Sequence, residues 1–561
     1  MTDSTTLDPF EDIKTRSRYL RGSIAAGLAD RATGALAEDD TKLTKFHGLY
    51  QQDDRDVRAE RRRQKLEPAY SFMVRVRLAG GVCTPAQWLA LDDLAVRYGG
   101  ASLRLTTRQT FQFHGIVKRD LKQTIRGIND ALLDTIAACG DVNRNVMASA
   151  NPHESAVHRA VWELAAAVSD ELLPRTRAYH EIWLDGEPVA GGEPEAEPLY
   201  GATYLPRKFK IGFAVPPVND VDVYANDLGF IALTDGKRVS GYNVAVGGGM
   251  GRSHGEPATY ARLASVIGAC RPEQVRAVAE QVIAVQRDFG DRTNRKHARL
   301  KYTIDDRGLA WFRAELERRL GFGLAPAVAV SFTHRGDRYG WREGDDGHWH
   351  LTLFIENGRL RDDATRAPLT ALREVARLHT GEFRCTPNQN VTIANVAPGA
   401  RAAIDAILAR HGLRDGTGVS AVRANAMACV ALPTCGLAMA ESERYLPALI
   451  TKIDDLLARH GLAGAPVVVR MTGCPNGCAR PYNAEIGLVG KAPGAYAVHL
   501  GGDVAGERLN VLVDENADEA GILALLDGHF AAWAAHRTAD ESFGDFLVRS
   551  GRLAAPAGGA A

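Results

Sequence analysis

The sequence predicts an α+β fold made of duplicated sheet-and-helix units related by pseudo-twofold symmetry. The first observation is an internal repeat, in which the segment Arg104–Gln109 recurs as Arg384–Gln389 with Arg, Thr and Gln matched. The second is that Asn145–Ala148 recurs at the same offset as Asn425–Ala428. The third is that strand-like and helix-like segments alternate along the chain, which favours a mixed sheet-and-helix architecture.

Each copy is expected to hold a strand, a helix and a further strand. In the first copy, Thr84-Pro85-Ala86-Gln87 forms a capping box with Pro at the first helical position, and Gly99-Gly100 ends the helix. In the second copy, Trp349–Glu356 is predicted as a strand and Pro368–His379 as a helix that stops at Gly381. The equivalent order in both copies supports the duplication.

Length and composition limit the class of protein. The chain has 561 residues, which favours about three or four structural units over one. Lys plus Arg and Asp plus Glu number 68 each, so the overall charge favours neither nucleic acid nor an anionic membrane surface as a partner. No apolar run approaches the roughly 20 residues that cross a bilayer, and Met1–Asp12 lacks the features of a signal peptide. A cytoplasmic location is expected.

The first 66 residues are rich in charge and poor in apolar side chains. A segment of this composition is expected to be a poorly packed arm that docks to a partner. A solvated tail without function is an equal alternative.

Several strand-like segments carry cationic or polar side chains at alternate positions, and a strand places such positions on one face. Any one of them is more simply a solvated outer face. Their number in a chain of zero net charge instead suggests an enclosed site for a polyanion. The side chains concerned are Arg75, Arg77, Arg104, Arg108, Gln112, His114, Lys208 and Lys210.

The cysteines give the strongest signal. Cys429 and Cys435 are separated by five residues, and Cys474 and Cys478 by three. Four thiolates on two short loops can hold a 4Fe-4S cluster or a tetrahedral zinc, and the five-residue gap exceeds the usual zinc spacing. The cluster is favoured, and zinc stays open. The remaining cysteines are isolated and are predicted to be small core residues, namely Cys83, Cys139, Cys270 and Cys385.

The two cysteine runs, Met427–Cys435 and Thr472–Cys478, resemble the siroheme and cluster signature of the sulfite and nitrite reductases. The resemblance covers nearly the whole chain and is strongest to one subgroup, the hemoprotein (beta) subunits of NADPH-dependent assimilatory sulfite reductases. Other segments that carry it are Phe46–Asp56, Arg104–Gly115, Asn143–Asn145, Leu205–Lys210 and Leu351–Gly358.

The resemblance implies a siroheme and a 4Fe-4S cluster at the interface of the duplicated units, and reduction of sulfite to sulfide in sulfate assimilation and cysteine biosynthesis. It implies that the four clustered cysteines bind the 4Fe-4S cluster and that Cys478 also ligates the siroheme iron. The implied anion-binding residues are Arg75, Arg144, Lys208 and Lys210. The residues expected to contact the siroheme carboxylates or to support the site are Arg104, Arg108, Gln112, His114 and Arg207.

The resemblance also implies a partner. No nucleotide-binding motif is found, so NADPH is expected to react on a separate flavoprotein (alpha) subunit carrying FAD and FMN, which docks on the N-terminal arm. Tyr70-Ser71-Phe72-Met73 instead resembles the ferredoxin-dependent branch, so a ferredoxin-dependent sulfite or nitrite reductase remains an alternative. A zinc or iron-sulfur protein with a structural role is the alternative from another class.

The expected division of the chain has five parts. They are an N-terminal arm (1–66), a first ferredoxin-like half (67–140), a first siroheme-binding domain (141–335), a second ferredoxin-like half (336–420) and a second siroheme and cluster domain (421–561).

Overall fold

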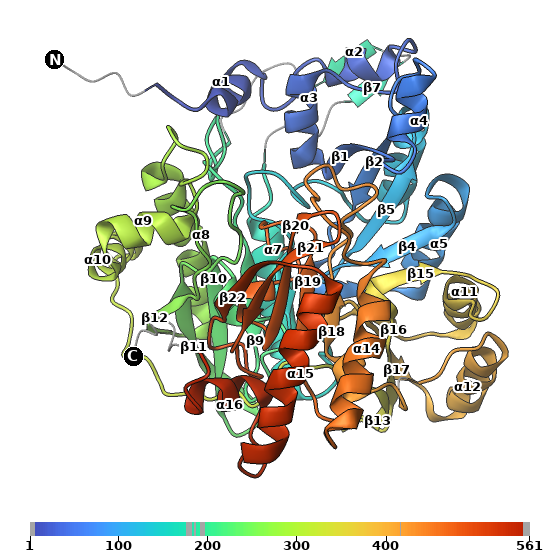
Figure 1. Cartoon of the computed structure of the whole chain (residues 1–561). Helices are drawn as coiled ribbons and strands as arrows, with labels where there is room; N and C mark the ends of the chain where they lie inside the picture. Colours follow the sequence, from blue (N-terminus) through green and yellow to red (C-terminus); the bar gives the residue numbers. More distant parts are fainter. Residues whose placement is uncertain (1–5, 176–181, 185–186, 191–196, 416, 554–561) are drawn as a thin grey trace.

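The computed structural model describes residues 6–175, 182–184, 187–190, 197–415 and 417–553. Within these ranges the strands form four five-stranded sheets and a two-stranded hairpin, β7 (Ile182–Leu184) with β8 (Glu187–Ala190). Figure 1 shows the expected division of the chain, with the segment called the first siroheme-binding domain (141–335) in green, the second (421–561) in orange and red, and the ferredoxin-like halves in blue and yellow beside them. The predicted α+β class is confirmed.

The two ferredoxin-like halves each contribute one antiparallel sheet. The first has the order β1 (Leu49–Asp53), β2 (Tyr70–Arg75), β5 (Phe111–Ile116), β4 (Ser102–Leu105), β15 (Arg359–Arg361). The second has the order β13 (Gly340–Glu343), β14 (Trp349–Leu353), β17 (Val391–Val396), β16 (Glu382–Cys385), β3 (Val82–Cys83). Their helices are α5 (Pro85–Tyr98), α6 (Leu121–Asp130), α11 (Pro368–Leu378) and α12 (Arg401–Arg410).

The halves exchange their edge strands. β15 comes from the second half but pairs with β4 of the first, and β3 comes from the first half but pairs with β16 of the second. One hydrophobic core runs through both halves, where Trp88 stacks on Phe383 with ring centroids 4.5 Å apart. The exchange and the shared core make the two halves one intertwined unit and show the predicted pseudo-twofold symmetry.

The expected capping box is present. The Thr84 hydroxyl accepts a hydrogen bond from the Gln87 amide at 3.2 Å, and the Gln87 side chain accepts one from the Thr84 amide at 3.0 Å. Helix α11 also lies where it was predicted. The strand predicted to reach Glu356 ends earlier, at Leu353, because the chain turns there, with Asn357 in the left-handed region at φ 51°.

The two siroheme-binding domains are each built on a mixed sheet. The strand order is β12 (Ser265–Cys270), β11 (Arg238–Val246), β10 (Leu228–Asp235), β9 (Ile211–Ala214), β6 (Met147–Ala148) in the first. It is β18 (Ala426–Ala428), β19 (Val469–Thr472), β20 (Ile486–Ala492), β21 (Ala495–Leu500), β22 (Val511–Ala517) in the second. The helices of the two domains are α7 (Ala156–Glu171), α8 (Val275–Phe289), α9 (Leu300–Arg307), α10 (Leu309–Leu320), α13 (Ala421–Ala424), α14 (Leu446–Arg459), α15 (Glu519–His536) and α16 (Phe543–Arg549).

The N-terminal segment corrects one expectation, because from α1 onward it is packed and not a loose arm. Phe10 and Ile13 of α1 (Pro9–Arg16) enter the core of the first siroheme-binding domain, and the buried Lys14 donates to the Leu205 carbonyl at 2.9 Å. Strand β1 pairs along its whole length with β2. The few apolar residues of the segment are thus enough to anchor it. The other helices are α2 (Ile24–Ala29), α3 (Glu38–Leu43) and α4 (Arg58–Arg63).

No helix within the described ranges is both long enough and apolar enough to span a bilayer.

Candidate cofactor and anion site

The four clustered cysteines lie on two neighbouring loops of the second siroheme-binding domain. Cys429 directly follows β18, and Cys474 lies two residues after β19, the parallel neighbour of β18. Parallel strands end at the same edge of a sheet, so the two loops meet there. The Gly473 amide donates to the Cys429 sulfur at 3.3 Å, and the Asn476 side chain approaches the Cys474 sulfur at 3.6 Å.

The thiols affect one another electrostatically. Burial raises the pKa of Cys429 far above its usual value, and the other three thiols raise it further. Burial, Cys478 and Cys435 together raise the pKa of Cys474 to about 11. A bound metal cluster would stabilise the thiolate forms of these four side chains.

The first siroheme-binding domain lacks these thiols. The register of β6 on β9 and of β18 on β19 makes Ser149 the counterpart of Cys429. The loops that follow β9 and β19 have equal length, which makes Asp220 the counterpart of Cys478. Ser149 donates to the Asp220 carboxylate at 3.0 Å. At these two equivalent positions, the first domain therefore has a serine hydrogen-bonded to an aspartate, whereas the second domain has two cysteines.

The predicted anion-binding lysines flank a buried aromatic residue, as their alternation indicated. Phe209 is fully buried, whereas Lys208 and Lys210 are half-buried. Burial lowers the pKa of both lysines well below the ordinary value, and neighbouring cations, among them Arg144, lower it further. Among the residues that the structure describes, neither lysine has a hydrogen bond or ion pair with a protein group. Their charges are therefore available to an anion.

Arg75 and Arg144 belong to the same group of cations. Arg75 ends β2, and its guanidinium donates to the Cys139 sulfur at 3.0 Å and, with the Gln112 amide turned over, to the Gln112 oxygen at 3.1 Å. Arg144 donates to the Gly140 carbonyl at 3.1 Å. Arg144 lowers the pKa of both lysines and of Arg108, and Arg75 also lowers that of Arg108. The four predicted anion-binding residues thus belong to one electrostatically coupled group of cations.

Two neighbours of this region were not predicted. Cys139 was expected to be an inert core residue, and it is buried, but it contacts Arg75. Burial and the nearby Cys139 thiol raise the pKa of Tyr50 to about 12. The signal that could have found Tyr50 is its place within the run Phe46–Asp56, which resembles the reductases.

Of the five residues predicted to contact or support siroheme, Gln112 contacts Arg75, and the other four divide into two groups. Arg104 and Arg108 are bound to protein groups: Arg104 donates to Glu443 at 2.8 Å, and Arg108 to Asn226 at 2.9 Å. Arg207 and His114 retain unused donors or acceptors. Burial and other arginines lower the pKa of Arg207 to about 10, and Nε2 of the buried His114 has no hydrogen-bond partner within the described part of the chain.

Comparison with known proteins places this arrangement in a family. A family model described as the nitrite/sulfite reductase ferredoxin-like half domain matches twice, at residues 63–131 and 342–411. A model described as the nitrite and sulphite reductase 4Fe-4S domain matches residues 165–324. The chain belongs to the nitrite and sulfite reductase family. The double match also confirms the duplication.

Individual relatives are similar over almost the full length. The sulfite reductase [NADPH] hemoprotein beta-component of Myxococcus xanthus is 60% identical over 98% of both chains. That of Oceanobacillus iheyensis is 57% identical over 98% of this chain and 95% of its own. The structure of the NirA protein of Mycobacterium tuberculosis has a TM-score of 0.78 at 25% identity and covers 97% of this chain and 96% of its own.

Family membership gives this chain a 4Fe-4S cluster and a siroheme as its cofactors and disfavours a structural zinc protein. The residues present fit both groups. Four cysteines on adjoining loops are the donor set of a cubane cluster. Half-buried cations without a carboxylate partner, together with the unpartnered His114 nitrogen, suit a ring that carries many carboxylates. Within the described residues, no three His, Cys, Asp or Glu side chains surround a position for a single metal ion.

Proposed function

We propose that this chain is the hemoprotein component of an NADPH-dependent assimilatory sulfite reductase and reduces sulfite to sulfide with six electrons. The observation that carries the proposal is the group of cations without carboxylate partners, Lys208 and Lys210 above all, in a chain that also holds four clustered thiols. A site of this kind attracts a small oxyanion and holds it in a low-dielectric environment.

We assign the binding of the sulfite oxygens to Arg75, Arg144, Lys208 and Lys210. Guanidinium forks and ammonium groups stabilise the negative charge that builds up on each oxygen as its bond to sulfur weakens. The lowered pKa values of Lys208 and Lys210 make them better proton donors near neutral pH than free lysines, so they can protonate the oxygens that leave as water.

We assign Cys429, Cys435, Cys474 and Cys478 as the residues that would hold the cluster, and Cys478 as the residue that would also hold the siroheme. When bound, the two groups would supply the electrons and the iron chemistry of the reduction. The protein contributes the hydrogen bond from the Gly473 amide to the Cys429 sulfur, and such bonds raise the potential of a cluster.

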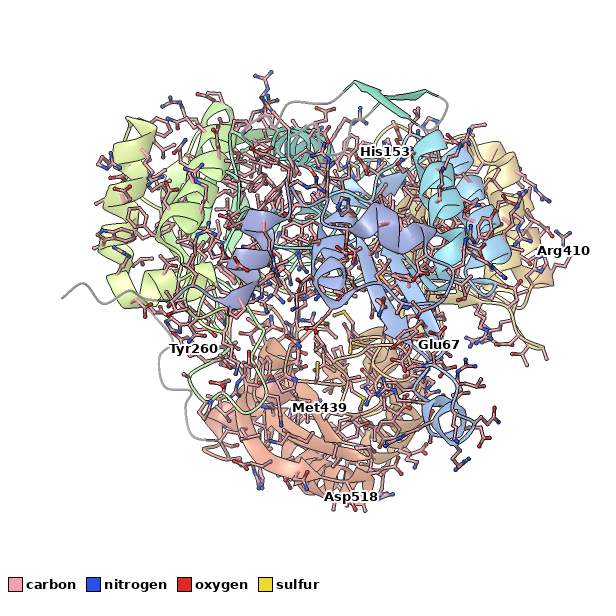
Figure 2. All side chains as sticks on the ribbon, turned by 90° about the horizontal axis from the view of Figure 1, so that it is seen from above. Glu67, His153, Tyr260, Arg410, Met439 and Asp518 are labelled. Atoms are coloured by element: carbon pink, nitrogen blue, oxygen red, sulfur yellow. The ribbon has the colours of Figure 1, made fainter. Side chains whose placement is uncertain are left out.

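We propose that electrons come from a flavoprotein carrying FAD and FMN. We place its docking site where the N-terminal segment contacts the loop between β18 and α14 (residues 429–445), called the cluster loop. Arg55 donates to the Ala438 carbonyl at 2.6 Å, and Arg444 pairs with Asp56 at 2.6 Å. Figure 2 labels Met439 in the second siroheme-binding domain and Glu67 directly after the N-terminal segment, which marks the two parts that these contacts connect. The relatives are named as NADPH enzymes and as beta-components, which supports a second, NADPH-oxidising chain.

The test is a measurement on the purified protein. Pigment extraction should yield a tetrapyrrole, analysis should find iron and acid-labile sulfide, and reduced methyl viologen should be oxidised when sulfite is added, with sulfide as the product. A protein without pigment, or one that makes no sulfide, would contradict the proposal. Comparing sulfite with nitrite, and NADPH plus flavoprotein with reduced ferredoxin, separates the neighbouring activities.

A further inference from the structure

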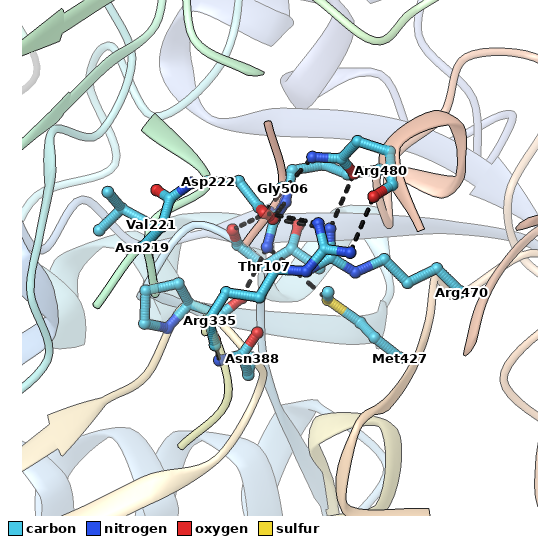
Figure 3. A network of polar contacts seen from close by, with 12 residues as sticks. Thr107, Asn219, Val221, Asp222, Arg335, Asn388, Met427, Arg470, Arg480 and Gly506 are labelled. Carbon is cyan, nitrogen blue, oxygen red and sulfur yellow. Dashed lines mark hydrogen bonds and ion pairs between the residues drawn. The ribbon is translucent and has the colours of Figure 1, made fainter. Parts of the chain in front are cut away.

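Asp222 and Arg480 occupy the same position in the two duplicated domains. Each directly precedes a three-residue turn, Val223–Ala225 or Pro481–Asn483, that leads into β10 or β20. Each also has a left-handed backbone, with φ 46° at Asp222 and 54° at Arg480. Although the positions are equivalent, the side chains have opposite charges, and they form an ion pair with each other across the domain interface (Figure 3).

Asp222 is the centre of a buried network. Its side chain is fully buried and accepts from Arg470 at 2.7 Å and from Arg335 at 3.1 Å, in addition to Arg480. Burial alone would raise the pKa of Asp222, but the three guanidinium groups outweigh it and hold the pKa far below the usual range. One carboxylate thus compensates three buried cations, so its loss would leave all of them without their shared partner.

Arg480 uses its remaining donors on the two ferredoxin-like halves. It donates to the Thr107 carbonyl at 2.9 Å and to the Pro387 carbonyl at 3.2 Å. Thr107 and Pro387 are themselves equivalent positions in the internal repeat. Arg480 therefore lies on the pseudo-twofold axis and joins both halves to the loop that carries Cys478.

The connection continues to the thiol residue itself. The Thr107 hydroxyl donates to the Cys478 carbonyl at 3.1 Å, and the Thr107 carbonyl accepts from Arg480. Thr107 therefore contacts both residues. The path from Asp222 through Arg480 and Thr107 to Cys478 is made of direct polar contacts. Polar partners behind a metal ligand orient it and tune its affinity.

We propose that Asp222 and Arg480 are positioning residues that fix Cys478 relative to both halves and so set the coupling between the cluster and the siroheme. The inference rests on the assignment of Cys478 as the shared ligand in the proposed function. Neither residue is expected to touch sulfite, since the contacts of both are with protein groups.

The test compares three variants with a matched control in the holoprotein. Thr107→Val removes only the hydrogen bond from the hydroxyl to the Cys478 carbonyl. Arg480→Lys keeps the positive charge but removes the guanidinium group with its several donors. Asp222→Asn removes the negative charge that the three arginines share. The control is Asp92→Asn, because Asp92 is another buried carboxylate, paired with Arg373 between α5 and α11. The readouts are the visible and paramagnetic-resonance spectra of the reduced protein and the rate at which the pigment is lost on dilution.

We expect the three variants to lose pigment about 10-fold faster than the wild type and to show altered coupling in the spectra. Asp92→Asn should lower the unfolding temperature but keep the wild-type spectra and rate. Wild-type spectra and pigment loss in both Thr107→Val and Arg480→Lys would overturn the inference, even if Asp222→Asn failed to fold. A wild-type protein without coupled spectra would contradict the proposed function itself.

Discussion

Glu443 and Cys429 are joined through their backbones: the Glu443 amide donates to the Cys429 carbonyl at 3.1 Å. The Glu443 carboxylate binds Arg104 at 2.8 Å and Arg359 at 2.6 Å, and Arg104 also donates to the Ala428 carbonyl at 2.9 Å. The backbone of the cluster loop is thereby fastened to the first ferredoxin-like sheet. This relationship gives Arg104 a supporting role that its place on a cationic strand face did not specify.

Replacing Glu443 by Gln should lower the free energy of unfolding by about 3 kcal/mol, because Arg104 and Arg359 lose their charged partner. Burial alone would raise the pKa of Glu443, but the two arginines outweigh it and hold the pKa below its ordinary value. The stabilisation is therefore present above about pH 4.3 and is lost as the pH falls through the lower pKa of the folded state. Urea unfolding of both proteins at several pH values measures it.

The matched control is Glu441→Gln, which removes a partly exposed carboxylate paired with Arg444 in the same loop. An exposed pair contributes less than about 1 kcal/mol, so this variant should unfold almost like the wild type. Equal losses in the two variants would show that Glu443 has no special part in holding the loop.

Replacing Lys208 by Met should abolish most sulfite reduction while the visible spectrum stays unchanged. The methionine keeps much of the side-chain volume but removes the charge that would bind the oxyanion and the proton that would be donated. Lys296→Met is the control, because Lys296 is exposed and pairs with Glu256 at 2.5 Å. Methyl-viologen-driven turnover measures both variants, and full activity in Lys208→Met would refute the assignment.

Local sequence signals predicted the fold well where a short motif decides the structure. The capping box at Thr84 fixed the start of α5, and the repeat that pairs Arg104 with Arg384 placed both residues on equivalent strands. The exchange of β3 and β15 could not be predicted, since it depends on which sheet edge each short strand meets after the halves pack. The same holds for the packed N-terminal segment.

Residue type and spacing alone gave the candidate site, as in the four clustered cysteines and the alternation of Lys208 and Lys210, and these assignments stay predictions. Contacts between segments that are distant in the chain could not be predicted from the sequence. Arg108, expected to contact siroheme or to support the site, also binds Asn226, and Cys139, expected to be a small core residue, also contacts Arg75. Nothing local marks Asp222 as the partner of three arginines from other segments. Such partners are defined only once the domains pack.

The buried pair of Asp141 and Arg295 predicts a second, distinct pH dependence. The two groups lie 2.5 Å apart, and although burial opposes ionisation, Arg295 and Lys14 lower the pKa of Asp141 to about 2. A lowered pKa means that the stabilisation is present above the unfolded value near pH 3.9 and disappears toward pH 2. Asp141→Asn should cost about 2.5 kcal/mol at pH 7. Denaturant unfolding should show this difference shrinking below pH 4, and a constant difference would contradict the prediction.

The surface around α4, where we propose that the flavoprotein docks, exposes both apolar and basic side chains. Val57, Leu66 and Leu437 are large hydrophobic residues with 40%, 49% and 66% exposure. Arg62 lies within α4 and Lys65 directly precedes Leu66, and both are exposed. Charges on a rim mainly govern the rate of association, and this rate falls as salt screens them.

Replacing Arg62 and Lys65 together by Glu should therefore slow NADPH-driven turnover through the flavoprotein by about 10-fold at low ionic strength, with a weaker dependence on salt than the wild type shows. Turnover driven by reduced methyl viologen should not change, because a small dye needs no docking surface. The matched control reverses Lys237 and Arg238, which are exposed between β10 and β11 and alter net charge equally. If both double variants slow the flavoprotein reaction alike, net charge alone explains the effect and the docking face lies elsewhere.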